Sequence, residues 1–228
     1  MADHDQDVDT GEVVVAKAKD FWEKYGKTVT ILIAAVIVGV GGYFVYQNFF
    51  KNPKEEKAAD TLFKAEEYYR LDSVNLALNG DGLNPGFLKV IDKYSGTDAA
   101  NLAYYYAGNC YIKLGDNDKA IKYLKKFDGK SKPVQARAYK LIADAEADLG
   151  KNNDALDYYK KAAHYFEKDE NNSAEYLFMA AYLADRVMKD QKEAISLYKE
   201  LKQKYPKTQQ GFEADSYLAQ LGVYHSEE

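Results

Sequence analysis

Few side chains in this sequence have the types and spacings that chemistry requires. Its three histidines, His4, His164 and His225, lie far apart, and Cys110 is its single cysteine. Nucleophilic catalysis needs Ser, His and Asp in one site, and structural zinc sites need Cys and His at short fixed spacings. Neither pattern occurs, and no glycine-rich phosphate loop occurs either. The sequence therefore predicts no enzyme, with no catalytic, cofactor-binding or metal-binding residues and no cofactor.

Two short motifs resemble sites. The loop Asn79-Gly80-Asp81-Gly82 matches part of a calcium loop but lacks further oxygen ligands at fixed spacing, so it predicts a turn. Asn171-Asn172-Ser173 fits a glycosylation acceptor, which matters only in a eukaryotic secretory protein. The numerous Asp and Glu residues are typical of solvated helix faces.

The most distinctive segment is residues 28–50, TVTILIAAVIVGVGGYFVYQNFF, which carry no charge. A helix needs about 20 residues to cross the hydrocarbon core of a membrane, and this segment is apolar on every side. Its aromatic residues gather at the C-terminal end, as in an interfacial belt. The segment therefore predicts a transmembrane helix.

A cleaved signal peptide is the alternative interpretation of this segment. Signal peptides have a shorter apolar run, a short basic start and small residues at the cleavage site. Here 27 residues precede the run and bulky aromatics end it, although Gly39 and Gly41 could mimic a weak cleavage site. An uncleaved anchor fits these features better.

Residues 1–27 form a tail with two halves. Asp3, Asp5, Asp7 and Asp9 make an acidic start, for which we expect disorder. The second half places apolar residues such as Phe21 and Trp22 on one helical face, which favours an amphipathic helix at the membrane surface. A simple helical extension of the anchor explains the same pattern.

Charge does not decide which way the anchor points. Lysines lie on both sides of residues 28–50, and a long following domain translocates largely regardless of its charge. The first 50 residues hold seven acidic and four basic residues, which leaves 29 acidic and 27 basic residues in the remainder. Nucleic-acid binding needs a basic surface, so this near-neutral remainder predicts no nucleic-acid partner, and nothing in it suggests a small-molecule substrate.

Residues 51–228 contain internal repeats. The stretch NLAYYYAGNCYIKLGDNDKAIKYLKKF resembles ARAYKLIADAEADLGKNNDALDYYKKA and, more loosely, EYLFMAAYLADRVMKDQKEAISLYKEL. Ala120, Ala155 and Ala194 align, at separations of 35 and 39 residues. Tetratricopeptide repeats have a period of about 34 residues with small and aromatic residues at matching places. The chain departs from that pattern at Glu146, Tyr182 and Asp185.

The repeat pattern has a physical basis. Ala120, Ala155 and Ala194 are small where paired antiparallel helices approach closely. Gly115 and Gly150 are expected to end the first helix of a unit in a left-handed conformation. Asp116 to Asp118 and Asn152 to Asp154 then offer caps for the next helix.

We therefore predict an all-α fold, in which an N-terminal transmembrane helix precedes a tetratricopeptide repeat solenoid with a C-terminal capping helix. The first unit is degenerate, with an unusually long connecting loop, SVNLALNGDGL. The predicted segments are the tail 1–27, the transmembrane helix 28–50, and the repeat domain 51–228 with units 54–96, 101–134, 136–170 and 175–208 and a capping helix 209–224.

A concave groove formed by the first helix of each unit is the candidate binding site. A mixed aromatic, aliphatic and polar lining of this kind suits an extended peptide or a partner helix. Packing between helices or plain exposure to water explains each residue equally well. Offsets shared by the units predict Leu102, Tyr105, Asn109 and Ile112, then Arg137, Lys140 and Asp144, then Tyr176, Met179, Leu183 and Arg186.

The arrangement of a short tail, one anchor and a repeat domain with a final helix resembles YfgM-type proteins of bacterial inner membranes. That resemblance implies an ancillary subunit of the Sec translocon that takes part in protein transport as a protein–protein interaction module. It implies a single-pass protein with a cytoplasmic N-terminus and periplasmic repeats, whose partners are a SecYEG-type translocon, periplasmic chaperones or client polypeptides. Two other functions fit the same architecture: a structural scaffold subunit of another envelope complex, and an anchored adaptor whose repeats face the cytosol.

Overall fold

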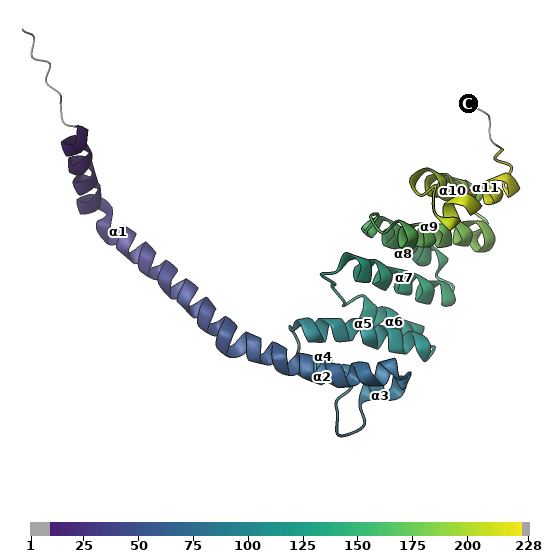
Figure 1. The fold of residues 1–228 in the computed structure, drawn as a ribbon, viewed down its shortest axis with the longest axis horizontal. Coiled ribbons are helices and arrows are strands. Elements are labelled where there is room, and N and C mark those ends of the chain that lie inside the picture. Colours follow the sequence, from purple (N-terminus) through teal and green to yellow (C-terminus); the bar gives the residue numbers. More distant parts are fainter. Residues whose placement is uncertain (1–9, 225–228) are drawn as a thin grey trace, which may run out of the picture. The chain divides into compact units, whose positions relative to one another are not determined.

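The computed structural model describes residues 10–224, with side chains from residue 14 onward, and every regular element within that range is helical. The acidic start of the tail, with Asp3 to Asp9, and both His4 and His225 lie outside the described residues. The chain forms two units, residues 1–53 and 54–228 (Figure 1). The elements are α1 (Thr10–Tyr46), η1 (Gln47–Lys51), α2 (Asn52–Arg70), α3 (Val74–Asn79), α4 (Phe87–Lys93), α5 (Asp98–Lys113), α6 (Asn117–Leu124), α7 (Lys132–Asp148), α8 (Asn152–Tyr165), α9 (Glu170–Tyr182), η2 (Leu183–Met188), α10 (Gln191–Lys204) and α11 (Gln209–Gln220).

The first of these two structural units, residues 1–53, is built around the apolar helix α1, which runs unbroken through residues 27 and 28. Its apolar side chains are exposed, among them Ile31 and Val36, which are 60% and 63% exposed. The Trp22 ring covers Gly26, where an added Cβ would lie 3.2 Å from the indole. The backbone then changes to the π-helical turn η1 at the aromatic end of the run.

Within the described residues, this is the one helix long and apolar enough to cross a membrane. Its apolar window has a mean hydropathy of 2.3 and is not buried against the rest of the protein. Length and composition alone leave a membrane anchor and a signal sequence as its two interpretations.

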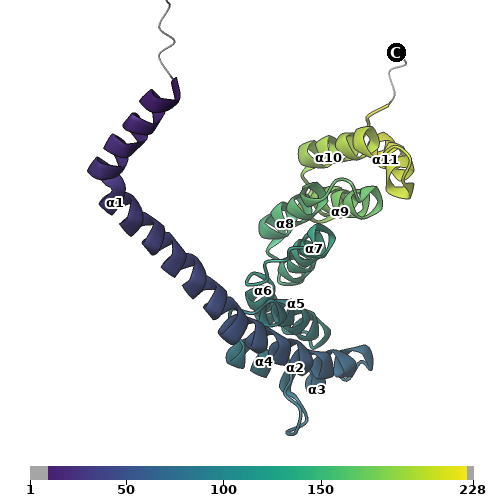
Figure 2. The ribbon, with the colours of Figure 1, turned by 60° about the vertical axis from the view of Figure 1, so that its left-hand side comes forward.

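The second unit is a stack of paired helices that follow one another in chain order (Figures 1 and 2). Ala120, Ala155 and Ala194 are completely buried, as the repeat pattern predicts. Gly108 on α5 faces α6 so closely that an added Cβ would lie 2.4 Å from Cγ of Leu124. Small residues therefore set the spacing between the two helices of a pair.

The two glycines predicted to end the first helices of repeats are found there in the predicted left-handed conformation. Gly115 and Gly150 have φ angles of +75° and +73°, in the left-handed region. After α5, the amide of Asp116 donates to the carbonyl of Tyr111 at 2.9 Å, and after α7 the amide of Lys151 donates to the carbonyl of Glu146 at 2.9 Å. These are the hydrogen bonds of a Schellman motif, which satisfies carbonyls at the end of a helix.

The caps after those turns are confirmed in one repeat and wrong in the next. The Asp116 side chain accepts a hydrogen bond from the amide of Lys119 at 3.1 Å and caps α6. The N-cap of α8 is Lys151, which makes no side-chain capping bond, so the caps predicted at Asn152 to Asp154 do not form. In the third repeat, Asp190 caps α10 through the amide of Glu193 at 3.0 Å.

The degenerate repeat, residues 54–96, which precedes the three regular repeats, differs from its prediction because the segment expected to be a long loop contains α3. Ala77 and Leu78 of that helix are buried against the same core as Phe87 of α4. The Asp81 carboxylate holds the loop together through hydrogen bonds. Its Oδ1 accepts a hydrogen bond from the amide of Leu83 at 2.9 Å, and its Oδ2 accepts one from the phenol of Tyr68 at 2.7 Å. Asp81 thus closes a turn, as the sequence predicts for this motif. The hydrogen bond from the backbone amide of Asn84, followed by that from the Tyr68 phenol, holds the pKa of the Asp81 carboxyl well below the ordinary value.

The third repeat changes helix type where the sequence departs from the repeat pattern. Its first helix begins as α9 and becomes π-helical in η2, which contains Asp185. It ends at Lys189, which has a φ of +58° at a place where the other two repeats have glycine. A π-helical turn holds more residues than an α-helical turn, and the separation from Ala155 to Ala194 is correspondingly longer than that from Ala120 to Ala155.

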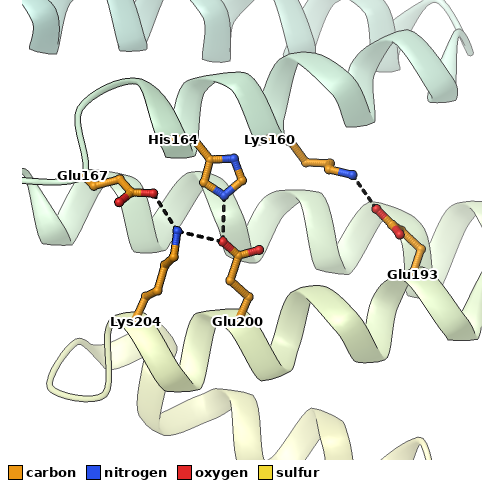
Figure 3. A network of polar contacts seen from close by, with 6 residues as sticks. All are labelled: Lys160, His164, Glu167, Glu193, Glu200 and Lys204. Atoms are coloured by element: carbon orange, nitrogen blue, oxygen red, sulfur yellow. Dashed lines mark hydrogen bonds and ion pairs between the residues drawn. The ribbon is translucent and has the colours of Figure 1, made fainter.

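A network of polar side chains joins α8 to α10 on the surface of the second unit (Figure 3). His164 Nε2 lies 2.8 Å from Oε1 of Glu200, and Lys204 Nζ lies 3.1 Å from the same oxygen. Lys204 also reaches Glu167 at 2.7 Å, while Lys160 pairs with Glu193 at 2.7 Å. These pairs connect the second and third repeats, and the final helix α11 then packs on α10.

Candidate functional site

A groove with a volume of about 510 Å³ crosses the first helices of three successive repeats, α5, α7 and α9. Those helices come together because each pairs with the second helix of its own repeat and stacks on the repeat before it. The groove contains five of the predicted site residues, Leu102 and Tyr105 from α5, Arg137 and Lys140 from α7, and Tyr176 from α9.

Aromatic rings form one wall of the groove. Tyr105 and Tyr106 have ring centroids 5.7 Å apart, and Tyr105 also lies 5.3 Å from Phe127. Tyr106 stacks on Phe87 at 5.1 Å with an interplanar angle of 7°. Rings packed in this way lose little entropy on binding a partner, so they offer a fixed apolar surface.

Two phenols of the groove, those of Tyr106 and Tyr176, stay neutral over the whole physiological pH range. Burial, with smaller contributions from Glu66, raises the pKa of Tyr106 to about 12. Burial, followed by the charge of Glu175, raises the pKa of Tyr176 to about 12. Both phenols can donate and accept hydrogen bonds, but neither supplies a charge or a nucleophile.

The two basic residues in the groove differ in their surroundings. Lys140 Nζ lies 2.8 Å from Oδ2 of Asp144, and Oδ1 of that carboxylate accepts the phenol of Tyr159 at 2.7 Å. Arg137 is exposed, and among residues 14–224 it forms no ion pair. Arg137 is therefore available to a ligand, whereas Lys140 already has a partner.

The remaining predicted positions lie outside this groove. Asn109 donates through Nδ2 to the carbonyl of Tyr105 at 2.8 Å, and Ile112 and Met179 are half-buried against the core. Leu183 is 7% exposed, because its side chain belongs to the core around α8 and α10. Arg186 pairs with Asp185 at 3.0 Å and donates to Gln220 at 2.6 Å.

Repeat offsets alone missed several lining residues. Val134 and Leu141 lie three residues before and four residues after Arg137, and Asn172 lies four residues before Tyr176. Residues three and four apart share one helix face, so this spacing was the signal that could have found them. The lining residues that the offsets did not predict are Tyr106, Pro133, Val134, Leu141, Asn172 and Glu175.

The thiol of Cys110 is unreactive. Cys110 is completely buried, and burial raises the pKa of its thiol to about 12, so the reactive thiolate does not form. Among the described residues, His, Cys, Asp and Glu form no cluster of three that could hold a metal ion.

Two models of known protein families match the chain. Residues 19–168, more than half of the chain, match the tetratricopeptide repeat-like domain, and residues 175–208 match a second tetratricopeptide repeat model. The chain belongs to the tetratricopeptide repeat-like domain family. The matched segment of this tetratricopeptide repeat-like protein begins inside α1 and continues through α8. Such repeats are scaffolds for protein–protein interaction and are typically non-enzymatic.

A solved structure shows the same fold. A crystal structure of nearly identical TPR-like repeats, assigned to a kinesin light chain of Podospora anserina, superposes on this tetratricopeptide repeat-like protein with a TM-score of 0.54. The two share 13% sequence identity, and the match covers 73% of this chain and 85% of the other. No curated protein sequence matches the chain.

Proposed function

We propose that this protein is a non-enzymatic, membrane-anchored accessory subunit of the bacterial Sec translocon. In this proposal α1 is an uncleaved anchor in the inner membrane, the N-terminus is cytoplasmic and the repeats are periplasmic. The groove between α5, α7 and α9 binds translocating polypeptides or periplasmic chaperones.

The groove is the observation that carries this proposal. Tyr105, Arg137 and Tyr176, from three different repeats, converge on one open groove of about 510 Å³. Tyr and Arg are the residue types that most often dominate the energy of protein interfaces, commonly with about 2 kcal/mol or more each. A groove made from the faces of several helices suits an extended or helical segment of a partner.

The exposed apolar surface of α1 supports the membrane part of the proposal. Side chains such as Ile31 and Val36 would expose a large apolar area to water if no lipid covered them. An anchor also confines the groove to the membrane surface, which raises its effective concentration beside a membrane-embedded partner. A site of modest intrinsic affinity can therefore function there.

Photocrosslinking in cells tests this function. Photoreactive residues replace Tyr105 or Val134 inside the groove, and Lys122 or Asp157, both exposed on the second helices, as matched controls. The chain is then purified in mild detergent and the crosslinked chains are identified. We expect translocon subunits, periplasmic chaperones or exported polypeptides at Tyr105 and Val134.

Two other outcomes would contradict the proposal and support a different function. Crosslinks confined to Lys122 and Asp157 would indicate a scaffold that docks through its outer face. Crosslinks from Tyr105 to cytosolic proteins would indicate an adaptor whose repeats face the cytosol.

A further inference from the structure

Two of the three basic residues predicted for the binding site already have acidic partners. Lys140 is held by Asp144 at 2.8 Å, and Arg186 is held by Asp185 at 3.0 Å and by Gln220 at 2.6 Å. Arg137, at the middle of the three repeats, forms no ion pair with any residue in the range 14–224. An unpaired guanidinium in an open groove favours a carboxylate, which it can bind through two parallel hydrogen bonds.

The surroundings of Arg137 add an apolar requirement. Val134 and Leu141 share its helix face on α7, and Tyr105 and Tyr106 lie across the groove on α5. Tyr105 and Tyr106 are each held by a further ring, Phe127 at 5.3 Å and Phe87 at 5.1 Å. The rings are therefore fixed in position before a ligand arrives.

Glu175 is the acidic residue that lines the same groove, from α9. We expect Arg137 to determine the charge of the bound ligand more strongly than Glu175 does, because Arg is enriched and Glu is depleted in the centres of protein interfaces. Glu175 and Arg137 form no ion pair with each other in the described residues, so the guanidinium stays open to a carboxylate of a ligand.

We propose that the groove selects polypeptide segments in which an Asp or Glu side chain, paired with Arg137, adjoins an aliphatic or aromatic residue that packs on Tyr105 and Tyr106. This inference rests on the proposed function, in that the groove binds polypeptide, and it names the chemistry of the segment. The acidic group is an internal side chain, since the groove is open and does not enclose a chain end.

The test is a peptide selection on the full-length protein in lipid nanodiscs. A library of random linear peptides is selected in parallel on the wild type, on Arg137→Glu and on Arg70→Glu. Arg70 is an exposed arginine at the end of α2, outside the groove, and serves as the matched control. Because both arginines are exposed, both variants should fold, which circular dichroism verifies.

We expect the wild-type and Arg70→Glu pools to be enriched in Asp or Glu beside an apolar residue. The Arg137→Glu pool should lose that enrichment and gain Lys or Arg at the same place. A synthetic peptide from the wild-type pool should bind Arg137→Glu about tenfold more weakly or worse, which corresponds to ~1.4 kcal/mol. Equal acidic content in all three pools would overturn the inference.

A photoreactive residue at Tyr105 distinguishes failure of this inference from failure of the proposed function. Selected peptides that crosslink at Tyr105 but show no acidic preference would refute the inference alone. Selected peptides that bind without crosslinking at Tyr105 or Val134 would refute the groove as the polypeptide site, and the inference with it.

Discussion

The carboxylate of Glu55 accepts a hydrogen bond from the backbone amide of Ala99 at 3.0 Å, although 44 residues separate them in the chain. Its second oxygen accepts the amide of Asp98 at 3.0 Å, and Thr97 Oγ1 accepts the amide of Ala100 at 3.0 Å. Three amides at the start of α5 are thus satisfied, two of them by a residue of α2. A negative charge at this place also interacts favourably with the helix dipole.

Substitution of Glu55 should therefore loosen the contact between α2 and the start of α5. We expect Glu55→Ala to lower the free energy of unfolding by about 1 to 2 kcal/mol, as for the loss of a helix cap. Urea titration of the full-length protein in detergent, followed by circular dichroism, measures this change. Glu56→Ala, at the exposed neighbouring position, should change it little. Equal losses in the two variants would contradict a capping role for Glu55.

The contact between Gly108 and Leu124 should behave as a coupled pair. An added Cβ at Gly108 meets the Leu124 side chain at 2.4 Å, so Gly108→Ala should cost about 1 to 3 kcal/mol through overpacking. Leu124→Ala creates a cavity and is destabilising by itself, but it also removes the clash. A double-mutant cycle should show that the combined loss is smaller than the sum of the two single losses. Strict additivity would mean that the two helices can separate freely.

The ends of the first helices allow a matched pair of backbone substitutions. Gly150 has a φ of +73° with open space around its Cα, whereas Lys189 has a φ of +58° at the corresponding place. A left-handed conformation costs a non-glycine residue roughly 1 to 2 kcal/mol. Gly150→Ala should therefore lower the melting temperature, and Lys189→Gly should raise or preserve it. A lower melting temperature for Lys189→Gly would show that the lysine side chain stabilises that turn.

The polar network between α8 and α10 predicts an acid dependence of stability. Burial raises the pKa of Glu200, but hydrogen bonds from His164 and Lys204 outweigh it and leave that pKa below the ordinary value of 4.5. The folded chain thus binds this proton less readily than the unfolded chain. The stabilisation is present above the unfolded pKa and is lost as the pH falls through the lower folded pKa.

Replacement of Glu200 tests this acid dependence. Glu200→Gln should make unfolding less sensitive to pH below 4.5, as measured by urea titrations over a series of acidic buffers. Asp157→Asn, at an exposed position on α8, should leave the dependence unchanged. If Glu200→Gln showed the same slope as the wild type, the network would not contribute to acid sensitivity.

The proposed topology predicts a protease pattern. In spheroplasts, protease added from outside should degrade residues 51–228, while a tag fused to the N-terminus should remain protected and attached to α1. An intact repeat domain, under conditions in which a periplasmic control is degraded, would place the repeats in the cytosol. Loss of the tag during export would identify α1 as a signal sequence.

Local signals predicted the repeats well. Ala120, Ala155 and Ala194 mark the sites where helices meet, and Gly115 and Gly150 mark the ends of first helices, because these places tolerate few other residues. The helix α3 was missed because its six residues have no helical period, and burial of Ala77 and Leu78 in the tertiary structure stabilises it.

The candidate groove was only partly predictable. Repeat offsets found Arg137 and Tyr176, but they assumed that every repeat has the same helix geometry. In the third repeat η2 begins at Leu183, and its wider turn changes the face on which later residues lie. The sequence shows that departure at Tyr182 and Asp185, but it does not state that the helix widens there.

The position of Trp22 on α1, where its ring covers Gly26, allows the two structural units to be distinguished by their fluorescence. The chain has one tryptophan and 21 tyrosines, and the tryptophan lies in α1, outside the repeats. Selective excitation of the indole would therefore report the environment of α1 alone, including its transfer between detergent and lipid. Tryptophan emission would not follow unfolding of the repeats, so the fluorescence of a single unmodified protein can separate membrane insertion from loss of the solenoid.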